Sequence, residues 1–551
     1  MPVLFAFSFA GPGAAAEPPP SASTAPLIGE IRVHRVNVFD PTVPGEDWWG
    51  FGLADKVHFL TREGLIRREL LLGLGEPWDP LKALESERNL RALGIFREAG
   101  LRPDLQPDGK LSLDVRTKDS WTTNLPLSAG TEGGDNFFSY GVSEDNIGGY
   151  GKAASFVHSQ YGPTISNQYR YDDPRFLGSR FALSPFYASS NFGNSIGTPL
   201  IRPFFALDTP VAAGANWSNT NNRTILYRDA VDYSNFLQHS LITSGSAGLR
   251  LDHDRYFVQR LEAGWYAEKQ EFASTEDTVA GTLPSDRRMS GPTLGYSWVQ
   301  PKYIKETYID KMERVEDFNM GNELKLFGGF MGSGTGSDRD RWLFNAMDQQ
   351  GLLFTPGRFA LSQVGMSGRL AGGQLENALL FTNLNLFWKT FWPYPQTWVG
   401  HLEANRGHGL DLENQIILGG NTGLRGYKND SFVGSKSVLL NLENRFFFPG
   451  EYFHLFRFGG AAFFDSGSVV PQEEGITFAR FKSDVGVGLR AGSIRSESGN
   501  IVRFEVAYAL NPGPGGSRFV VAVLGRQAFQ IFNSSTGRIH QSPGTILNQE
   551  N

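Results

Sequence analysis

Three charged residues in the C-terminal part of the chain are spaced so that they could form an ion-pair site. Arg425 lies in the glycine-rich stretch 418–427 (LGGNTGLRGY), and Glu443 and Asp465 follow it. A guanidinium presents a rigid fork of N–H donors to carboxylates, so arginine suits a fixed anchor better than lysine does. Two interpretations remain open: the loop folds inward and Arg425 meets both acids, or the loop is an exposed turn and both acids are solvated.

The segments that carry the two acids have the pattern of β-strands with one apolar and one polar face. Polar and apolar side chains alternate in 437–448 and 456–465, as expected where successive side chains of a strand point to opposite faces. The apolar positions are Val438, Leu440, Leu442, Phe446, Phe456, Phe458, Ala462 and Phe464. Glu443 and Asp465 both fall on the polar face, which points into the lumen of a transmembrane β-barrel.

Composition narrows the class of protein. The 551-residue chain has 65 glycines, 43 phenylalanines, no cysteine and a net charge of −6. Beyond the N-terminus it has no apolar run of the roughly 20 residues that a membrane-spanning helix needs, whereas the weaker signal of barrel strands fits. The lack of cysteine excludes thiol catalysis, disulfides and cysteine metal sites. The mild acidity provides no basic patch, so we expect no nucleic-acid partner.

Residues 1–28 are predicted to be a signal peptide and linker. The apolar run 1–16 ends in three alanines, like the core and cleavage site of a secretory signal, although no Lys or Arg precedes it. The stretch 17–26, rich in proline, serine and alanine, would follow the cleavage site. The alternative is a disordered apolar tail. Export followed by a barrel indicates an outer membrane.

Residues 29–118 have the pattern of a small α/β domain. A strand is expected at 31–38, followed by a helix after Thr61 and a second helix that begins at Asp79-Pro80. Two further strands flank the turn Pro107-Asp-Gly109. The predicted order is therefore strand, helix, helix, strand, strand.

Residues 120–529 lose the helical period and become short alternating segments separated by Gly, Asn, Asp and Pro clusters. Seventeen candidate strands can be counted, twelve of them before the loop 406–435. An odd number must precede a loop on the side opposite the N-terminal domain, so we discount 357–371. The sequence thus predicts a 16-stranded antiparallel transmembrane β-barrel, with loop 406–435 inserted in the lumen and long outer loops at 191–244 and 330–375.

No catalytic motif stands out. The chain has no Gly-x-Ser-x-Gly elbow, no His-Glu-x-x-His and no complete phosphate loop. Asp252-His253-Asp254 could be imagined as a catalytic or metal cluster, but a short turn between two strands explains it equally. We therefore expect no enzyme activity, no metal and no cofactor.

Together these features resemble the outer-membrane assembly-factor superfamily, which includes BamA-type insertases and two-partner-secretion translocators (bacterial surface antigen family). Three motifs match in order: LRGY at 424–427, LENRFFFP at 442–449 and FFDSG at 463–467. The element order of 29–118 is that of a POTRA (polypeptide-transport-associated) domain. The resemblance covers about 29–529.

The resemblance implies particular site residues and a mechanism. The loop anchor would comprise Leu424, Arg425, Gly426 and Tyr427, with lumen partners Glu443, Asp465 and Gly467. The first and last strands would meet at a weak lateral seam that includes Leu125, Leu127, Gly525 and Phe529. An open seam offers unpaired backbone groups to a client strand, and the POTRA sheet edge receives clients in the same way.

The implied function is insertion of unfolded outer-membrane proteins into a Gram-negative outer membrane, with the POTRA domain in the periplasm. Outer-membrane lipids are expected partners, and periplasmic chaperones or accessory lipoproteins are further candidates. The chain departs from the family in having only one POTRA domain and a C-terminal extension, 530–551. Two alternatives therefore stay open: a translocator that secretes one dedicated partner or transfers lipid, and a porin-like channel.

Overall fold

The computed structural model describes residues 25–132, 135–162, 164–252, 254–493, 495–496, 501–514 and 518–524. Most of the predicted signal peptide and linker, all of the extension 530–551, and His253 of the Asp-His-Asp turn lie outside the described residues. None of the helices within these ranges is long and apolar enough to cross a membrane.

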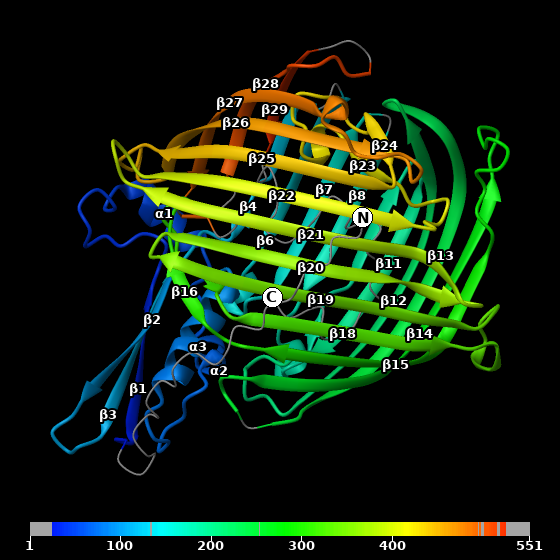
Figure 1. Ribbon diagram of the computed structural model, residues 1–551. Helices are drawn as coiled ribbons and strands as arrows, with labels where there is room; N and C mark the ends of the chain where they lie inside the picture. Colours follow the sequence, from blue (N-terminus) through cyan, green and yellow to red (C-terminus); the bar gives the residue numbers. More distant parts are fainter. Residues whose placement is uncertain are drawn as a thin grey trace.

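The N-terminal unit is a three-stranded sheet with helices (Figure 1). Its strands are β1 (Ile28–Val36), β2 (Phe96–Leu105) and β3 (Leu111–Asp119), and its helices are α1 (Trp49–Val57), α2 (Glu63–Glu69) and α3 (Pro80–Ala92). The strand order is β1-β3-β2, with β1 parallel and β2 antiparallel to β3. The apolar sides of α2, α3 and the sheet share one core of Ile28, Leu65, Ile66, Leu72, Ala83, Leu90, Ile95, Phe96, Leu101, Leu113 and Val115.

Local sequence explains which helices could be predicted. Asp79 accepts hydrogen bonds from the backbone N–H groups of Leu81 and Lys82, and Pro80 occupies the first turn, so the predicted start of α3 is confirmed. Helix α1 was missed. It contains two glycines and has no side-chain cap, so its sequence carries little helix signal, and it is held by Phe51, which stacks on Phe39 at 4.2 Å.

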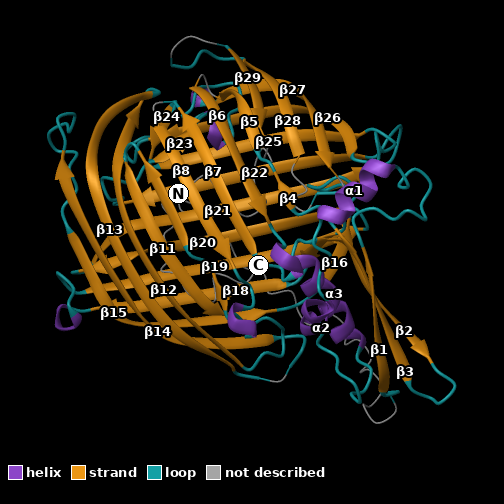
Figure 2. Cartoon of the chain, turned by 180° about the vertical axis from the view of Figure 1, so that it is seen from behind, coloured by secondary structure: helices purple, strands orange, loops and turns teal. Residues whose placement is uncertain are grey.

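The rest of the chain forms one large antiparallel sheet that curls around an interior (Figures 1 and 2). Its 22 segments are β4 (Thr123–Asn124), β5 (Leu127–Glu132), β6 (Asp135–Glu144), β7 (Ala153–Tyr161), β8 (Thr164–Asp172), β9 (Ala182–Leu183), β10 (Phe186–Ser190), β11 (Gly193–Arg202), β12 (Val211–Arg228), β13 (Val231–Arg250), β14 (Val258–Ser274), β15 (Arg287–Val299), β18 (Asn322–Met331), β19 (Arg341–Thr355), β20 (Arg358–Ala371), β21 (Gln374–Thr390), β22 (Gln396–His408), β25 (Lys436–Phe447), β26 (Phe456–Val470), β27 (Lys482–Ser493), β28 (Ile501–Ala509) and β29 (Phe519–Leu524). Strand β8 pairs with both β7 and β10, and β29 precedes β4 and β5 in the strand order.

The predicted count of sixteen strands is wrong. Segments β4 and β5 both pair with β6, and β9 and β10 both pair with β11, so the 22 segments occupy twenty positions in the sheet. The discounted segment 357–371 is β20, and the predicted outer loops 191–244 and 330–375 contain β11 to β13 and β19 to β20. Fifteen of the twenty positions precede the loop after β22, which is the odd number that the placement of this loop requires.

Burial along the strands is inverted relative to a water-soluble sheet. In β22 the outward side chains Trp398 and Leu402 are exposed, while His401, Glu403 and Asn405 on the inward face are buried. Apolar groups outside and polar groups inside are what a strand in a membrane barrel requires.

We expect the stability of the N-terminal unit to fall as the pH rises. Asp119 is fully buried and accepts hydrogen bonds from the backbone N–H of Thr61 (2.7 Å) and its hydroxyl (2.8 Å). Burial raises the pKa of Asp119 to about 7, from 3.8. The folded state therefore binds the proton more tightly than the unfolded state, and the free energy of unfolding decreases between these pH values, by on the order of a few kcal/mol.

Proteolysis of the full chain between pH 5 and pH 8 measures this effect. Cleavage within 25–119 should accelerate with pH beyond the protease's own pH dependence, and Asp119→Asn should remove that excess. An unchanged excess in Asp119→Asn would show that another group is responsible.

Candidate functional site

The loop between β22 and β25 folds into the interior of the large sheet. Its two arms pair as the short strands β23 (Ile416–Leu418) and β24 (Phe432–Gly434). Between them, a tip with a 3-10 turn at Gly420–Thr422 carries the LRGY motif. Leu424, Arg425, Gly426 and Tyr427 are all buried, which excludes the exposed-turn interpretation of this segment.

The guanidinium of Arg425 binds both predicted acids. Its Nε and Nη2 donate to the two carboxylate oxygens of Asp465 at 2.8 and 2.9 Å, and its Nη1 donates to Glu443 Oε2 at 2.7 Å. The same Nη1 lies 3.7 Å from Glu505 Oε1, and the guanidinium stacks 3.4 Å from the centroid of the Phe463 ring. The pair with Asp465 is bidentate, which fixes both the position and the plane of the arginine.

Glu443 is shared among three arginines. Besides Arg425, it accepts from Arg445 Nε at 2.7 Å and from Arg490 Nη1 at 3.0 Å. These arginines come from the loop and from strands β25 and β27, and all four groups are buried. A buried charge that loses its partner is strongly destabilising, so the loop tip and the strands stabilise one another.

The other residues of the motif fit the loop against the wall. A Cβ atom on Gly426 would lie 2.5 Å from Asp484 Cβ, so only glycine permits this approach. Tyr427 donates its hydroxyl to the carbonyl of Ser483 at 2.9 Å. Leu424 packs in an apolar cluster with Leu418, Tyr427, Leu439 and Ala509.

The remaining predicted site residues lie elsewhere. Gly467 is next to the loop, but a Cβ there would meet Leu418 and the carbonyl of Val438, each at 3.1 Å, so its neighbour is the hairpin rather than the Arg425 guanidinium. Leu125 and Leu127 are 76% and 71% exposed, and β5 lies beside β29: a Cβ on Gly130 would be 3.1 Å from Val523 N. Gly525 and Phe529 lie outside the described residues.

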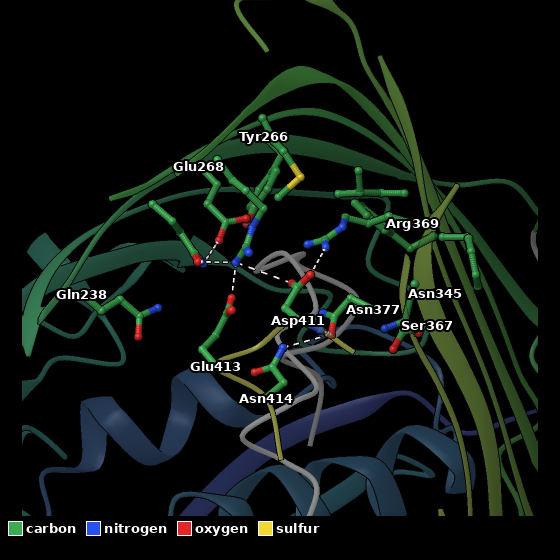
Figure 3. Close-up of a pocket in the computed structure, with 17 residues that line it drawn as sticks. Gln238, Tyr266, Glu268, Asn345, Ser367, Arg369, Asn377, Asp411, Glu413 and Asn414 are labelled. Atoms are coloured by element: carbon green, nitrogen blue, oxygen red, sulfur yellow. Dashed lines mark hydrogen bonds and ion pairs between the residues drawn. The ribbon is translucent and has the colours of Figure 1, made fainter. Parts of the chain in front are cut away.

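A second set of ion pairs holds the base of the loop to strands β15 and β20 of the wall (Figure 3). Arg287 of β15 binds Glu413, and Arg369 Nη2 of β20 donates to Asp411 Oδ1 at 2.5 Å. These groups border a polar cavity of about 100 Å³. Gln415 further bonds both backbone groups of Tyr227 in β12, at 2.9 and 3.1 Å. Sequence analysis missed this site, because the partners are far apart in the chain and ordinary in type.

A third connection comes from the segment 300–321, between β15 and β18. It contains the hairpin β16 (Tyr303–Glu306) and β17 (Glu316–Asn319) and packs against the inward face of the sheet. Its apolar cluster comprises Ile309, Phe318, Met320, Phe359, Leu361, Phe387 and Val399. Arg445 Nη1 donates to the carbonyl of Ile309 and to Asp310 Oδ1, both at 2.7 Å.

The far end of this segment binds the N-terminal unit. Arg91 of α3 makes a bidentate pair with Asp317, at 2.7 and 2.8 Å, and Lys305 Nζ donates to Glu87 Oε2 at 2.5 Å. A continuous series of contacts therefore runs from α3 through 300–321 and Arg445 to Glu443 and Arg425. The strand pattern leaves 300–316 as a loop and assigns 317–329 to one strand, so no sequence signal pointed to the hairpin of β16 and β17.

Comparison with known proteins shows which proteins the chain is similar to. No family model matches the sequence. The chain is 30% identical over 126 residues to the outer membrane protein assembly factor BamA of Neisseria meningitidis serogroup B, a match that covers 22% of this chain and 16% of that protein. It is 33% identical over 90 residues to BamA of Neorickettsia risticii, covering 16% of this chain and 12% of the relative. The matches therefore span well under two thirds of either relative.

These matches agree with the resemblance that the motifs indicated, to the outer-membrane assembly-factor superfamily, and the chain is a protein of the Gram-negative outer membrane. Among solved structures it is similar to BamA from Haemophilus ducreyi lacking POTRA domains 1-3, with 14% identity and a TM-score of 0.37 over 90% of this chain and 85% of that chain. It is also similar to CdiB from Acinetobacter baumannii, with 10% identity and a TM-score of 0.47 over 91% and 73% of the two chains.

We expect Arg425→Ala to release the loop tip without unfolding the barrel. Glu443 and Asp465 would lose their shared partner, at a cost of roughly 3–5 kcal/mol to loop docking. Protease cleavage within 409–435 should increase, and activity should fall. Arg425→Lys, which keeps the charge but loses the fork, should give an intermediate result. Arg480→Ala, which removes a half-exposed arginine of the neighbouring loop, is the control. Unchanged cleavage and activity in Arg425→Ala would refute the anchor.

We expect Asp310→Ala to loosen the segment 300–321 inside the barrel. The change removes the carboxylate that accepts from Arg445, while Arg445 keeps its pair with Glu443. Planar-bilayer recordings should show more frequent openings than in the wild type. Lys311→Ala, at the exposed neighbouring position, should behave as wild type. Equal opening frequencies in all three proteins would argue that the segment does not obstruct the lumen.

Proposed function

We propose that the protein inserts unfolded β-barrel proteins into the outer membrane. In this proposal the sheet closes through β29 against β5, the N-terminal unit is a single POTRA domain in the periplasm, and clients enter through the seam between first and last strands. The observation that carries it is the inserted loop, whose tip is fixed by four buried charges while β5 and β29, the first and last parts of the sheet in the chain, lie side by side.

The wall can open only where neighbouring strands give up the backbone hydrogen bonds between them. Strands β12 and β13 pair over eighteen residue pairs, so this part of the wall carries many backbone hydrogen bonds. Separation of β29 from β5 would expose unpaired N–H and C=O groups that a client strand can satisfy. The Arg425 network, formed by Arg425, Glu443, Asp465, Arg445 and Arg490, keeps β25 to β27 in place while the seam opens. The N-terminal sheet, with β1 and β2 at its edges, would receive client segments before insertion, alone or from periplasmic chaperones or accessory lipoproteins.

A second function is favoured by the content of the lumen. The loop 409–435 and the segment 300–321 both fold into the interior, where a translocator that secretes a dedicated partner would need gates. An insertase with a lateral seam does not need an open lumen. The two functions therefore differ in which part must move: the seam or the lumen segments. A porin-like channel would conduct steadily without either movement.

Engineered disulfides distinguish these functions, because the native chain has no cysteine. The seam tether joins Gly130→Cys and Val523→Cys, and the lumen tether joins Phe318→Cys and Phe359→Cys, whose native rings lie 5.0 Å apart. The assay is folding of a urea-unfolded outer-membrane protein in liposomes that contain each variant.

We expect the seam tether to abolish accelerated client folding and the lumen tether to leave it unchanged, with activity restored by a reductant. If the lumen tether alone blocked client folding, the result would favour the translocator. No acceleration by the wild type, together with steady conductance, would favour the porin-like channel and contradict the insertase.

A further inference from the structure

A cavity of about 730 Å³ lies between the N-terminal unit and the large sheet. One side is formed by the end of β1 and by α2, and the other by the turns after β6 and β8. It is lined by Arg35, Arg62, Glu63, Gly64, Leu65, Arg68, Tyr150, Lys152, Tyr171, Asp173, Arg175, Phe176, Leu177 and Gly178. Neither the Arg425 network nor the seam reaches this place.

The cavity has an excess of positive charge. Its lining contains five basic side chains and two acidic ones. Lys152 is paired with Asp173 at 3.0 Å, and Arg175 with Glu69.

The other three basic residues, Arg35, Arg62 and Arg68, form no ion pair with any residue that the structure describes. Arg35 donates to the carbonyl of Thr61, and Arg62 donates to that of Gly148. Arg35 also acts electrostatically on the buried Asp119. Three guanidinium groups without a directly bound carboxylate form a receptor for an anion, and phosphate oxygens match their donor geometry.

The rim of the cavity is apolar and exposed. Leu177 is 87% exposed at the tip of its turn, and Tyr150, whose ring is covered on one side by Arg62, is 48% exposed. Both turns stand at the ends of strands whose outer faces carry the exposed side chains Phe138, Tyr140, Val142, Tyr169 and Tyr187. Aromatic side chains with a polar tip favour the boundary between the acyl chains and the headgroups of a bilayer.

We propose that this cavity binds the phosphate group of an anionic phospholipid from the leaflet on the side of the N-terminal unit. The three arginines bind the phosphate oxygens, and Leu177 and Tyr150 contact the start of the acyl chains. A free phosphate ion would use the same arginines but would gain nothing from the apolar rim. The bound lipid would bridge α2 and the wall, and so contribute to holding the N-terminal unit against the barrel.

Native mass spectrometry of the full chain in mild detergent tests this site. The protein is mixed with equal amounts of phosphatidylglycerol and phosphatidylcholine with identical acyl chains. The wild type should retain phosphatidylglycerol preferentially, and the double variant Arg35→Gln/Arg68→Gln should retain about tenfold less. Arg62 is left in place because it also connects the N-terminal unit to Gly148. The matched control Arg102→Gln/Arg116→Gln removes two exposed arginines from the sheet of the same unit and should retain as much lipid as the wild type.

Each further outcome decides the proposal. Equal retention by the double variant and the wild type, or an equal loss in the control, would overturn it. Excess inorganic phosphate separates the two sources of the anion: lipid that stays bound supports a lipid site, whereas full displacement shows that the cavity recognises the free ion. Heat-modified mobility on gels, compared across all variants, confirms that each barrel is folded.

Discussion

The structure depends on one shared carboxylate, Glu443, which is sealed in the interior with three arginines around it. Removing such charges from water costs more than any single pair returns, so the arrangement is stable only when all partners are present. Arg425 comes from the inserted loop, Arg445 from the same strand as Glu443, and Arg490 from β27. The loop tip and the strands β25 and β27 are thereby constrained together, because no member of the cluster can leave without stranding a charge.

This constraint extends well beyond the loop. Arg445 also binds the segment 300–321, and that segment binds α3 through Asp317. The base of the loop is fixed separately, by Arg287 of β15 and Arg369 of β20. The loop thus crosses the interior as a brace with polar attachments at both ends. A displacement of the N-terminal unit has a direct route of packed and hydrogen-bonded groups to the tip, which is a physical path for coupling between the two.

The features that could be predicted from the sequence are those that a short stretch of residues specifies by itself. Alternation in 437–448 and 456–465 identified the shared face of Glu443 and Asp465, and Asp79-Pro80 marked the start of α3. Strand β12 was lost because it runs through NWSNTNNRT, which is polar on both faces and resembles a loop. Asp310 and Arg445 are 135 residues apart, and the sequence around either residue does not indicate that it contacts the other. Contacts of this kind are set by tertiary geometry, which a pattern of single residues does not encode.

The length of β12 and β13 has a consequence for how far the wall projects beyond the membrane. These strands have 18 and 20 residues, or roughly 60 Å of extended chain, whereas a tilted strand needs only about 9–11 residues to cross a bilayer. The strands on this side therefore extend beyond the length that lipid can cover. The turn between them meets the inserted loop, because the Ala230 N–H donates to the carbonyl of Asp430 at 3.2 Å. Insertions at the exposed Asp229 would lengthen this projection while leaving the part of the barrel embedded in lipid untouched.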